Sequence, residues 1–188
     1  MKNNYIISTN HQKVLSFLVK FSDGEFYERE IARKLNISTG SANEVLKDLY
    51  SSSLVKRHKK GNMCFYSIDN THAVFKQFKI LNNIILLLPL AEKLKDISIK
   101  IVLFGSCAEG KDTSKSDIDL FIISDQRRKA LQIIGNHHLG NGFEGIEIQP
   151  SIQSPLELIQ SEKKDKEFLS LIKEGIVLWE KPTDESRI

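Results

Sequence analysis

Residues 99–123 read IKIVLFGSCAEGKDTSKSDIDLFII, and this stretch decides the fold of the C-terminal half of the chain. It begins with an apolar, β-rich run at 99–104, continues with Gly105-Ser106 and a polar segment, and ends in a second apolar run at 118–123. Apolar runs of this length bounded by glycine and polar residues are typical of strands. We therefore expect a strand, a glycine turn with a polar loop, and a second strand.

Two aspartates stand at the start of the second apolar run. Side chains alternate along a strand, so Asp117 and Asp119 are predicted to lie on one face while Ile118 and Leu120 fill the core. Like charges held this close repel each other, and a hard divalent cation bound by both carboxylates removes the conflict. An isolated Asp-x-Asp is also typical of a solvated strand end, so the pair alone does not decide the function.

The aspartates follow Gly105-Ser106 at a distinctive spacing. Gly-Ser followed about ten residues later by Asp-x-Asp, with a strand on each side, resembles the nucleotidyltransferases of the DNA polymerase beta-like superfamily, and above all their minimal stand-alone branch. The resemblance extends over residues 97–180. It implies that Gly105 and Ser106 hold the phosphates of a nucleoside triphosphate and that Asp117 and Asp119 bind Mg²⁺ or Mn²⁺ and act in catalysis.

The same resemblance calls for a third carboxylate on a later strand. Glu147 lies between two isoleucines and is the residue we expect to bind the metal and help deprotonate the acceptor hydroxyl; Glu144, nearer the glycines, is less favoured. Two positions depart from the family pattern, where a larger or basic residue is common: they are Cys107 and Glu109. No histidine is arranged to activate Cys107, which argues against thiol chemistry.

The remaining C-terminal residues are predicted to complete this domain. Residues 154–173 are interpreted as two helices and residues 175–180 as a closing strand, an order that also resembles minimal nucleotidyltransferases. The basic run 127–129 is interpreted as the solvated start of a helix in preference to a phosphate-binding group. Residues 183–188 are expected to form a flexible tail.

The N-terminal third has the periodicity of three short helices. Val14, Leu15, Leu18 and Val19 have the spacing of an amphipathic helix that ends near residues 22–24. A second helix is predicted at 27–35, and a third begins at Ser38 or Thr39 and buries Ala42, Val45, Leu46 and Leu49. Two helices joined by such a short turn are typical of a helix-turn-helix, in which the second helix enters the major groove.

A basic β-hairpin is predicted directly after the third helix. Residues 54–58 and 63–68 have the composition of strands, and Lys59-Lys60-Gly61-Asn62 is expected to form the turn. With the helices, this pattern resembles the winged helix of small prokaryotic transcription regulators. The implied duplex-DNA surface comprises Ser38, Thr39, Ser41, Asn43 and Lys47 towards the bases and Arg57, Lys59 and Lys60 towards phosphates. Winged helices also serve as docking or dimer modules, and this alternative stays open.

Charge and connectivity fit a chain with two domains. Residues 1–70 hold 11 Lys and Arg against 7 Asp and Glu, whereas residues 71–188 hold 16 against 17, so the positive excess is N-terminal and suits a polyanionic partner. A long amphipathic helix is predicted at 72–88, with Pro89 ending it or beginning the next one. This helix packs either between the domains or against its copy in a homodimer, and the sequence leaves both alternatives open. We expect domains at 1–70 and 97–182, joined by helices at 71–96.

Composition limits the location and the chemistry. Two cysteines without a Cys-x-x-Cys motif indicate neither a disulfide framework nor a structural zinc site. The apolar run 84–88 is far shorter than a membrane span, which needs about 20 residues. We therefore expect a cytoplasmic protein without a membrane partner.

These observations predict an α+β chain: an N-terminal winged helix of three helices and a β-hairpin, then a small mixed-sheet α/β nucleotidyltransferase fold. The resemblance implies transfer of AMP from ATP to a macromolecular hydroxyl, for example on a partner protein such as the toxin of a toxin–antitoxin pair, with DNA binding that regulates the chain's own gene. The main alternative is a transcription regulator whose nucleotidyltransferase fold only senses nucleotide or dimerises. Transfer to an RNA or an antibiotic is a third hypothesis.

Overall fold

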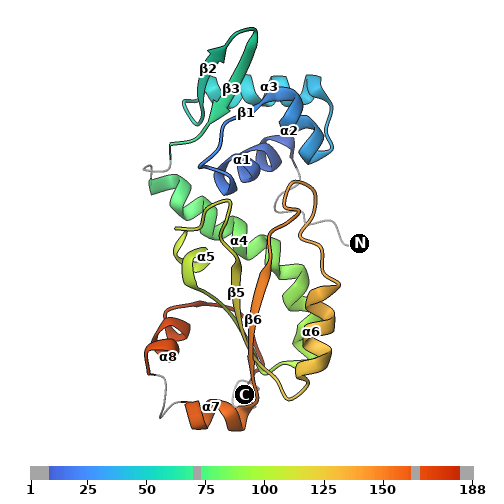
Figure 1. Ribbon diagram of the computed structural model, residues 1–188, viewed down its shortest axis with the longest axis vertical. Helices are drawn as coiled ribbons and strands as arrows, with labels where there is room; N and C mark the ends of the chain where they lie inside the picture. The colour runs from blue at the N-terminus through green and yellow to red at the C-terminus, as the bar shows by residue number, and fades with distance from the viewer. Residues whose placement is uncertain (1–8, 70–72, 162–165, 183–188) are drawn as a thin grey trace. The chain divides into compact units, whose positions relative to one another are not determined.

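The structure, a computed structural model, describes residues 9–69, 73–161 and 166–182, and the chain divides into two compact units (Figure 1). The first unit comprises Met1–Ile85, Asp112–Lys115 and Leu139–Gly145; the second comprises Leu86–Lys111, Ser116–His138 and Ile146–Ile188. Two short segments of the C-terminal half thus belong to the first unit. The tail expected to be flexible, 183–188, lies outside the described residues.

Three helices of the first unit lie where the apolar periodicity places them. They are α1 (Asn10–Lys20), α2 (Glu28–Leu35) and α3 (Thr39–Ser51). Thr9 and Gln12 form a capping box at the start of α1, and the Ser38 side chain caps α3 by accepting from the Ser41 amide. The predictions of these helices, including the start of the third at Ser38 or Thr39, are confirmed.

A three-stranded antiparallel sheet completes the first unit. Its order is β1 (Phe26–Tyr27), β3 (Met63–Ser67) and β2 (Lys56–Lys60). The hairpin of β2 and β3 was predicted, but the four-residue turn was wrong: β2 continues through Lys60, and only Gly61-Asn62 form the turn. Gly61 has a φ of 60°, as tight hairpin turns require. The strand β1 was not predicted, because two residues carry no periodicity.

The core of the first unit joins all three helices to the sheet. It is formed by buried side chains from α1, α2, α3, the hairpin and the start of the next helix, which are Val14, Phe17, Leu18, Val19, Ile31, Leu35, Val45, Leu46, Leu49, Val55, Tyr66, Ile68 and Phe75. The aromatic rings of Phe17, Phe21 and Phe26 contact one another within this core. Burial of one face of every helix is what holds these short elements in place.

The second unit is built on a mixed four-stranded sheet of order β6-β5-β4-β7. The strands are β4 (Lys100–Phe104), β5 (Ile118–Ile123), β6 (Ile148–Gln153) and β7 (Ile176–Glu180). Strand β5 runs parallel to β6, whereas the pairs β4·β5 and β4·β7 are antiparallel. This confirms the predicted mixed sheet and its closing strand.

Both faces of this sheet are apolar. On one face, Val102, Phe121 and Ile123 pack against side chains that include Leu158 of α7 (Pro155–Ser161) and Phe168 of α8 (Lys166–Lys173). On the other face, the fully buried side chains include Ile101, Leu103, Ile118, Leu120 and Ile122. Helix α6 (Arg127–Gly135) contacts β6. The prediction that Ile118 and Leu120 fill the core is confirmed, since both are fully buried.

The connecting helix is longer than predicted. Helix α4 spans Ala73–Leu94 and continues through Pro89, followed by a short 3₁₀ turn, Lys95–Ile97. Pro89 is exposed, while Leu87, Leu90 and Leu94 are buried on one side of the helix. By length and composition alone, Val74–Ile97 is apolar enough to cross a membrane, a property that core helices of soluble proteins share.

Candidate active site and candidate nucleic-acid interface

The Gly-Ser motif lies at the end of β4 and begins a short helix. The predicted glycine turn and the first part of the polar loop form a short helix, α5 (Gly105–Glu109), which starts directly after Phe104. The rest of the predicted loop, 111–117, is neither helix nor strand, as expected. Gly105 has a φ of 67°, a conformation that side chains disfavour. A Cβ atom at Gly105 would lie 2.5 Å from Oδ2 of Asp119. The backbone of the Gly-Ser motif therefore lies directly against the Asp119 carboxylate, which only glycine permits.

The two aspartates differ in exposure. Asp119 is half-buried within β5 opposite Phe104, and Asp117 is exposed immediately before the strand. Burial raises the pKa of Asp119 above its ordinary value, and the nearby negative charge of Asp117 raises it further. Ile118 and Leu120 are fully buried on the opposite side, as predicted. The site therefore holds two close carboxylates whose repulsion nothing in the described protein neutralises.

The helix α5 is bonded to the entry of β5. The Cys107 thiol is fully buried and donates to the backbone carbonyl of Asp117 at 3.4 Å. The amide of Lys111 donates to the carbonyl of Ser106 at 3.0 Å, closing the helix after Gly110. Burial of Cys107 fits a structural role and not the chemistry of an accessible thiolate. The two departures from the family pattern thus act differently, since Glu109 is exposed and pairs with Lys111 at 2.5 Å.

The third carboxylate does not lie within a strand, which corrects the expectation for Glu147. Strand β6 begins at Ile148, and Glu147 is exposed just before it. Its carbonyl accepts from the amide of Ile118 at 2.9 Å, which continues the β5·β6 ladder by one residue. Since Asp119 pairs with Gln149, the same register sets Glu147 beside Asp117. The strand is shorter than predicted because the residues before it form glycine-rich turns.

The residues described in 9–69, 73–161 and 166–182 contain no group of three His, Cys, Asp or Glu side chains close enough to hold a metal ion together. The less favoured Glu144 belongs to the first unit, where it accepts from the amide of Gly142 at 2.9 Å. The donors that the site offers are carboxylate oxygens of Asp117 and Asp119. Oxygen donors of this kind suit Mg²⁺ or Mn²⁺, which take few protein ligands and keep bound water.

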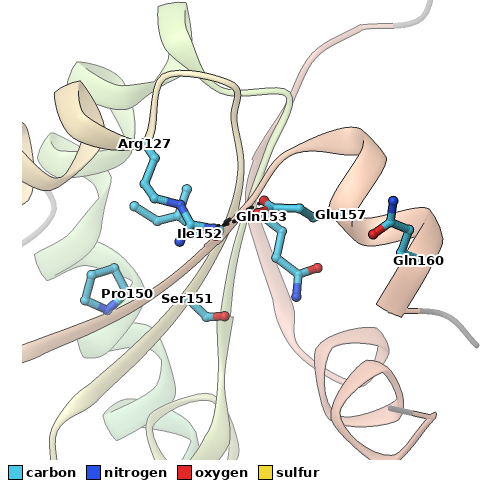
Figure 2. Close-up of a pocket in the computed structure, with 7 residues that line it drawn as sticks. All are labelled: Arg127, Pro150, Ser151, Ile152, Gln153, Glu157 and Gln160. Carbon is cyan, nitrogen blue, oxygen red and sulfur yellow. Dashed lines mark hydrogen bonds and ion pairs between the residues drawn. The ribbon is translucent and has the colours of Figure 1, made fainter. Parts of the chain in front are cut away.

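The basic run after β5 has a structural explanation at its first residue. Figure 2 shows a polar pocket lined by residues of β6, α6 and α7, with Arg127 directed towards Ile152 and Glu157. The Arg127 guanidinium donates to the Ile152 carbonyl at 2.6 Å and forms an ion pair with Glu157 at 3.2 Å. Strand β6 is an edge of the sheet, and Arg127 covers one of its backbone carbonyls. This supports the interpretation of Arg127 as a helix start.

Several side chains predicted to contact DNA bases make bonds within the first unit. The Ser38 hydroxyl accepts from the Ser41 amide at 3.1 Å, and the Ser41 hydroxyl accepts from Asn10 at 2.6 Å. The Asn43 amide donates to the carboxylate of Glu28. Thr39 and Lys47 are exposed on α3. The surface of α3 thus offers these two directly, while the other three positions are already hydrogen-bonded.

The cations of the hairpin differ in their contacts within the first unit: Lys60 and Arg57 each contact other side chains, whereas Lys59 is exposed. Lys60 pairs with Glu25 at 2.5 Å and lies 5.1 Å from the ring centre of Phe65. Its ammonium lowers the pKa of Glu25 by hydrogen bonding, against the opposing effect of burial. Arg57 contacts Cys64 at 3.1 Å and lies over the Tyr50 ring, and Lys59 is exposed. The role of Glu25 gave no signal in the sequence, because 35 positions separate it from Lys60.

Comparison with known proteins bears on the second unit. Curated protein sequences give no significant match to the chain. The model of the family described as "Polymerase beta, Nucleotidyltransferase" matches residues 87–184, which is more than half of the chain and includes Gly105, Ser106, Asp117 and Asp119. This confirms nucleotidyl transfer as the general chemistry predicted from the sequence. The chain belongs to the polymerase beta nucleotidyltransferase family.

Proposed function

We propose that this protein transfers AMP from ATP, with Mg²⁺ or Mn²⁺, to a hydroxyl group of a macromolecule. The observation that carries the proposal is the contact of the Gly105 backbone with Asp119, next to the repelling carboxylate of Asp117. In this proposal, the Gly105 turn binds phosphates and the two neighbouring carboxylates bind the metal at the same point of the sheet. A divalent cation bound there offsets the charges of the triphosphate and of the departing pyrophosphate.

In the proposed reaction, Gly105 and Ser106 hold the terminal phosphates. The carboxylates of Asp117 and Asp119 would hold the divalent cation, which would supply positive charge to offset that of the phosphates. The acceptor oxygen forms a bond to the α-phosphorus, the bond from that phosphorus to the bridging oxygen breaks, and pyrophosphate leaves. Glu147, beside Asp117 in the extended register, receives the hydroxyl proton.

A macromolecular acceptor is proposed because the catalytic part is small. The family match covers residues 87–184, and the described sheet carries only short helices. Among the described residues of this range, no large accessory element stands beside the sheet to enclose a small substrate. By analogy with the minimal branch, the acceptor is a hydroxyl of a partner protein such as a toxin.

For the first unit we propose a winged helix that binds duplex DNA. Support comes from the order of α1, α2, α3 and the hairpin, and from the short turn between α2 and α3 at 36–38. The exposed side chains of Thr39, Lys47 and Lys59 are the primary contacts, and Arg57 and Lys60 reach phosphates when their internal partners yield.

Two measurements test the proposed transfer, and DNA binding with and without ATP tests the alternative. Calorimetric titration with ATP, with and without Mg²⁺, is expected to show metal-dependent binding that is lost in Asp117→Ala/Asp119→Ala. Incubation with α-labelled ATP and a lysate of the source organism is expected to label a macromolecule. Equal ATP binding by the wild type and the double variant contradicts the site. Absence of transfer together with ATP-sensitive DNA binding favours the nucleotide-sensor alternative.

A further inference from the structure

A buried charged cluster in the first unit is centred on Asp112. The Lys20 ammonium lies 2.6 Å from Oδ2 of Asp112, and neither side chain is exposed at all. Asn83 of α4 donates to the other carboxylate oxygen at 3.1 Å. Both oxygens of this carboxylate are therefore bonded by side chains from α1 and α4, which are both distant from Asp112 in the sequence.

The neighbouring backbone is held as well. Lys79 of α4 donates to the backbone carbonyl of Asp112 at 2.6 Å and contacts Ser22 at 3.3 Å. Two residues further on, the Ser114 hydroxyl donates to Asp23 at 2.6 Å. Although burial alone would raise it, the pKa of Asp23 is lowered by hydrogen bonds that include this one, and by the charge of Lys79. The segment Asp112–Lys115 is thus fixed through its side chains and its main chain.

Because the cluster around Asp112 is buried, it favours one position of the segment Asp112–Lys115. Ionised groups lose their hydration when they are buried, and the loss is offset only if geometry and hydrogen bonding are good. A loop that only connected two elements at the surface would not need such a cluster. Removal of one partner leaves an uncompensated buried charge, so the arrangement favours one position of the segment over all others.

The anchored segment joins the two halves of the nucleotidyltransferase motif. Gly105 and Ser106 precede it, Asp117 and Asp119 follow it, and the residues on both sides belong to the second unit. Only two residues, Lys115 and Ser116, separate Ser114 from Asp117. Because the chain is continuous, the position of Asp112 limits where Asp117 can lie.

We infer that Lys20 and Asp112 are positioning residues. Through them, the first unit holds the metal-binding aspartates, Asp117 and Asp119, in place for nucleotidyl transfer. This inference rests on the proposed function of Asp117 and Asp119. It assigns to the first unit a part in catalysis in addition to the proposed DNA binding. Residues that do not bind the metal themselves but orient its ligands commonly change metal affinity or activity by about 10- to 100-fold when they are replaced.

The test compares two variants with a matched control. Asp112→Asn keeps the shape of the side chain and removes its charge, and Ser114→Ala removes a single hydrogen bond and is the milder change. Lys56→Met is the control, since it breaks an ion pair of the same unit whose side chains are 65% and 44% exposed. Amide hydrogen exchange of residues 113–119 is measured without ligands, and Mn²⁺ affinity in the presence of ATP is measured by electron paramagnetic resonance.

Asp112→Asn is expected to speed exchange at 113–119 and to weaken Mn²⁺ binding by about 10- to 100-fold, with Ser114→Ala smaller in the same direction. Excess Mn²⁺ is expected to restore most of the transfer rate, which loss of folded protein would not allow. Should Asp112→Asn fail to fold, Ser114→Ala decides alone. Unchanged exchange and unchanged Mn²⁺ affinity in a folded variant overturn the inference. Faster exchange in a protein whose wild type binds no Mn²⁺ overturns the proposed function and supports the anchoring.

Discussion

The carboxylate site and the proposed DNA surface differ in how far the protein satisfies its own polar groups. At the carboxylate site, Asp119 lies against Gly105 and next to Asp117, and burial with the like charge raises its pKa. On the proposed DNA surface, Asn43 bonds Glu28 and Lys60 pairs with Glu25. Within the part of the chain that the structure describes, the first site therefore lacks a compensating charge, whereas the second already has internal partners.

This difference bears on what each site gains from a ligand. A cation bound as proposed would remove the repulsion between Asp117 and Asp119, so that repulsion would favour binding at the carboxylates. If the first unit binds DNA as proposed, phosphates would compete with Glu25 for Lys60, so part of the attraction would be offset by breaking an ion pair. The carboxylate site is thus expected to respond to substitution far more strongly than the hairpin.

The largest expected effect is that of Asp119→Asn on nucleotidyl transfer. The substitution keeps the shape of the side chain and removes the charge that is proposed to bind the metal. Transfer of labelled AMP should fall by about two orders of magnitude or more, because charge at the leaving pyrophosphate is no longer stabilised. DNA affinity measured without nucleotide should hardly change. Labelling that persists in the variant would contradict the metal assignment.

Two glutamates provide a matched comparison for the same assay. Glu147→Gln should lower transfer while largely preserving ATP binding, because Glu147 is assigned to the acceptor proton. Glu144→Gln changes a residue that bonds the Gly142 amide in the first unit and should leave transfer near the wild-type rate. The reverse ranking of these two variants would exchange their roles.

The next effect concerns the salt dependence of DNA binding. Removing one lysine that neutralises a phosphate should reduce the slope of log K against log salt by about one. Lys59→Ala is expected to show this full change, since Lys59 is exposed, and Lys60→Ala a smaller one, since Lys60 is paired with Glu25. Fluorescence anisotropy over a salt series measures both slopes.

Glu25→Gln sharpens this comparison, because it releases Lys60 and should raise DNA affinity. Lys173→Ala, at an exposed lysine of α8 in the second unit, is the control for a plain change of net charge. Equal slopes for the wild type and for Lys59→Ala would remove the hairpin from the interface.

The sequence predicted most of the architecture because its signals were local. Alternation around Ile118 and Leu120 indicated the buried strand, and the serine before Thr39 indicated the start of a helix. The boundaries that were wrong depended on tertiary context: α4 continues through Pro89 since its buried side is apolar, and β2 includes Lys60 since it pairs with Met63.

The candidate site was predictable for a different reason. The spacing of Gly105 and Asp119 is a family pattern, and the residues lie together as that pattern implies. Partners distant in sequence gave no such signal. Neither Glu25 beside Lys60 nor Lys20 beside Asp112 could be inferred, since charge pairs of this kind depend on how separate elements pack.

A smaller effect is expected for Ser38→Ala, which tests whether Ser38 acts as a helix cap or as a DNA contact. Loss of the cap on the Ser41 amide should lower the free energy of unfolding by about 1 kcal/mol. Thr39→Ala, one residue later on the exposed surface, should change stability by less than about 0.5 kcal/mol. Urea denaturation of both variants gives the comparison. Unchanged stability of Ser38→Ala with abolished DNA binding would assign the hydroxyl to DNA.

The smallest effect is on the stability of the metal-free protein. The pKa of Asp119 is raised above its ordinary value of 3.8 by burial and by Asp117, so the folded chain retains this proton at a pH where the unfolded chain has released it. The contribution of Asp119 to stability therefore falls as the pH rises from below 3.8 through the raised pKa. Asp119→Asn removes this loss, so the metal-free variant should be slightly more stable than the wild type at about pH 7, and the difference should vanish in acid. The pKa values of Asp23, Glu25 and Glu157 are lowered and act in the opposite direction, but they are common to both proteins and cancel in the difference.

Saturating Mg²⁺ should reverse the order of stability of the two proteins, because only the wild type is expected to bind the cation and be stabilised by it. Equal stability of the two proteins with and without Mg²⁺ would mean that the carboxylates are not in conflict.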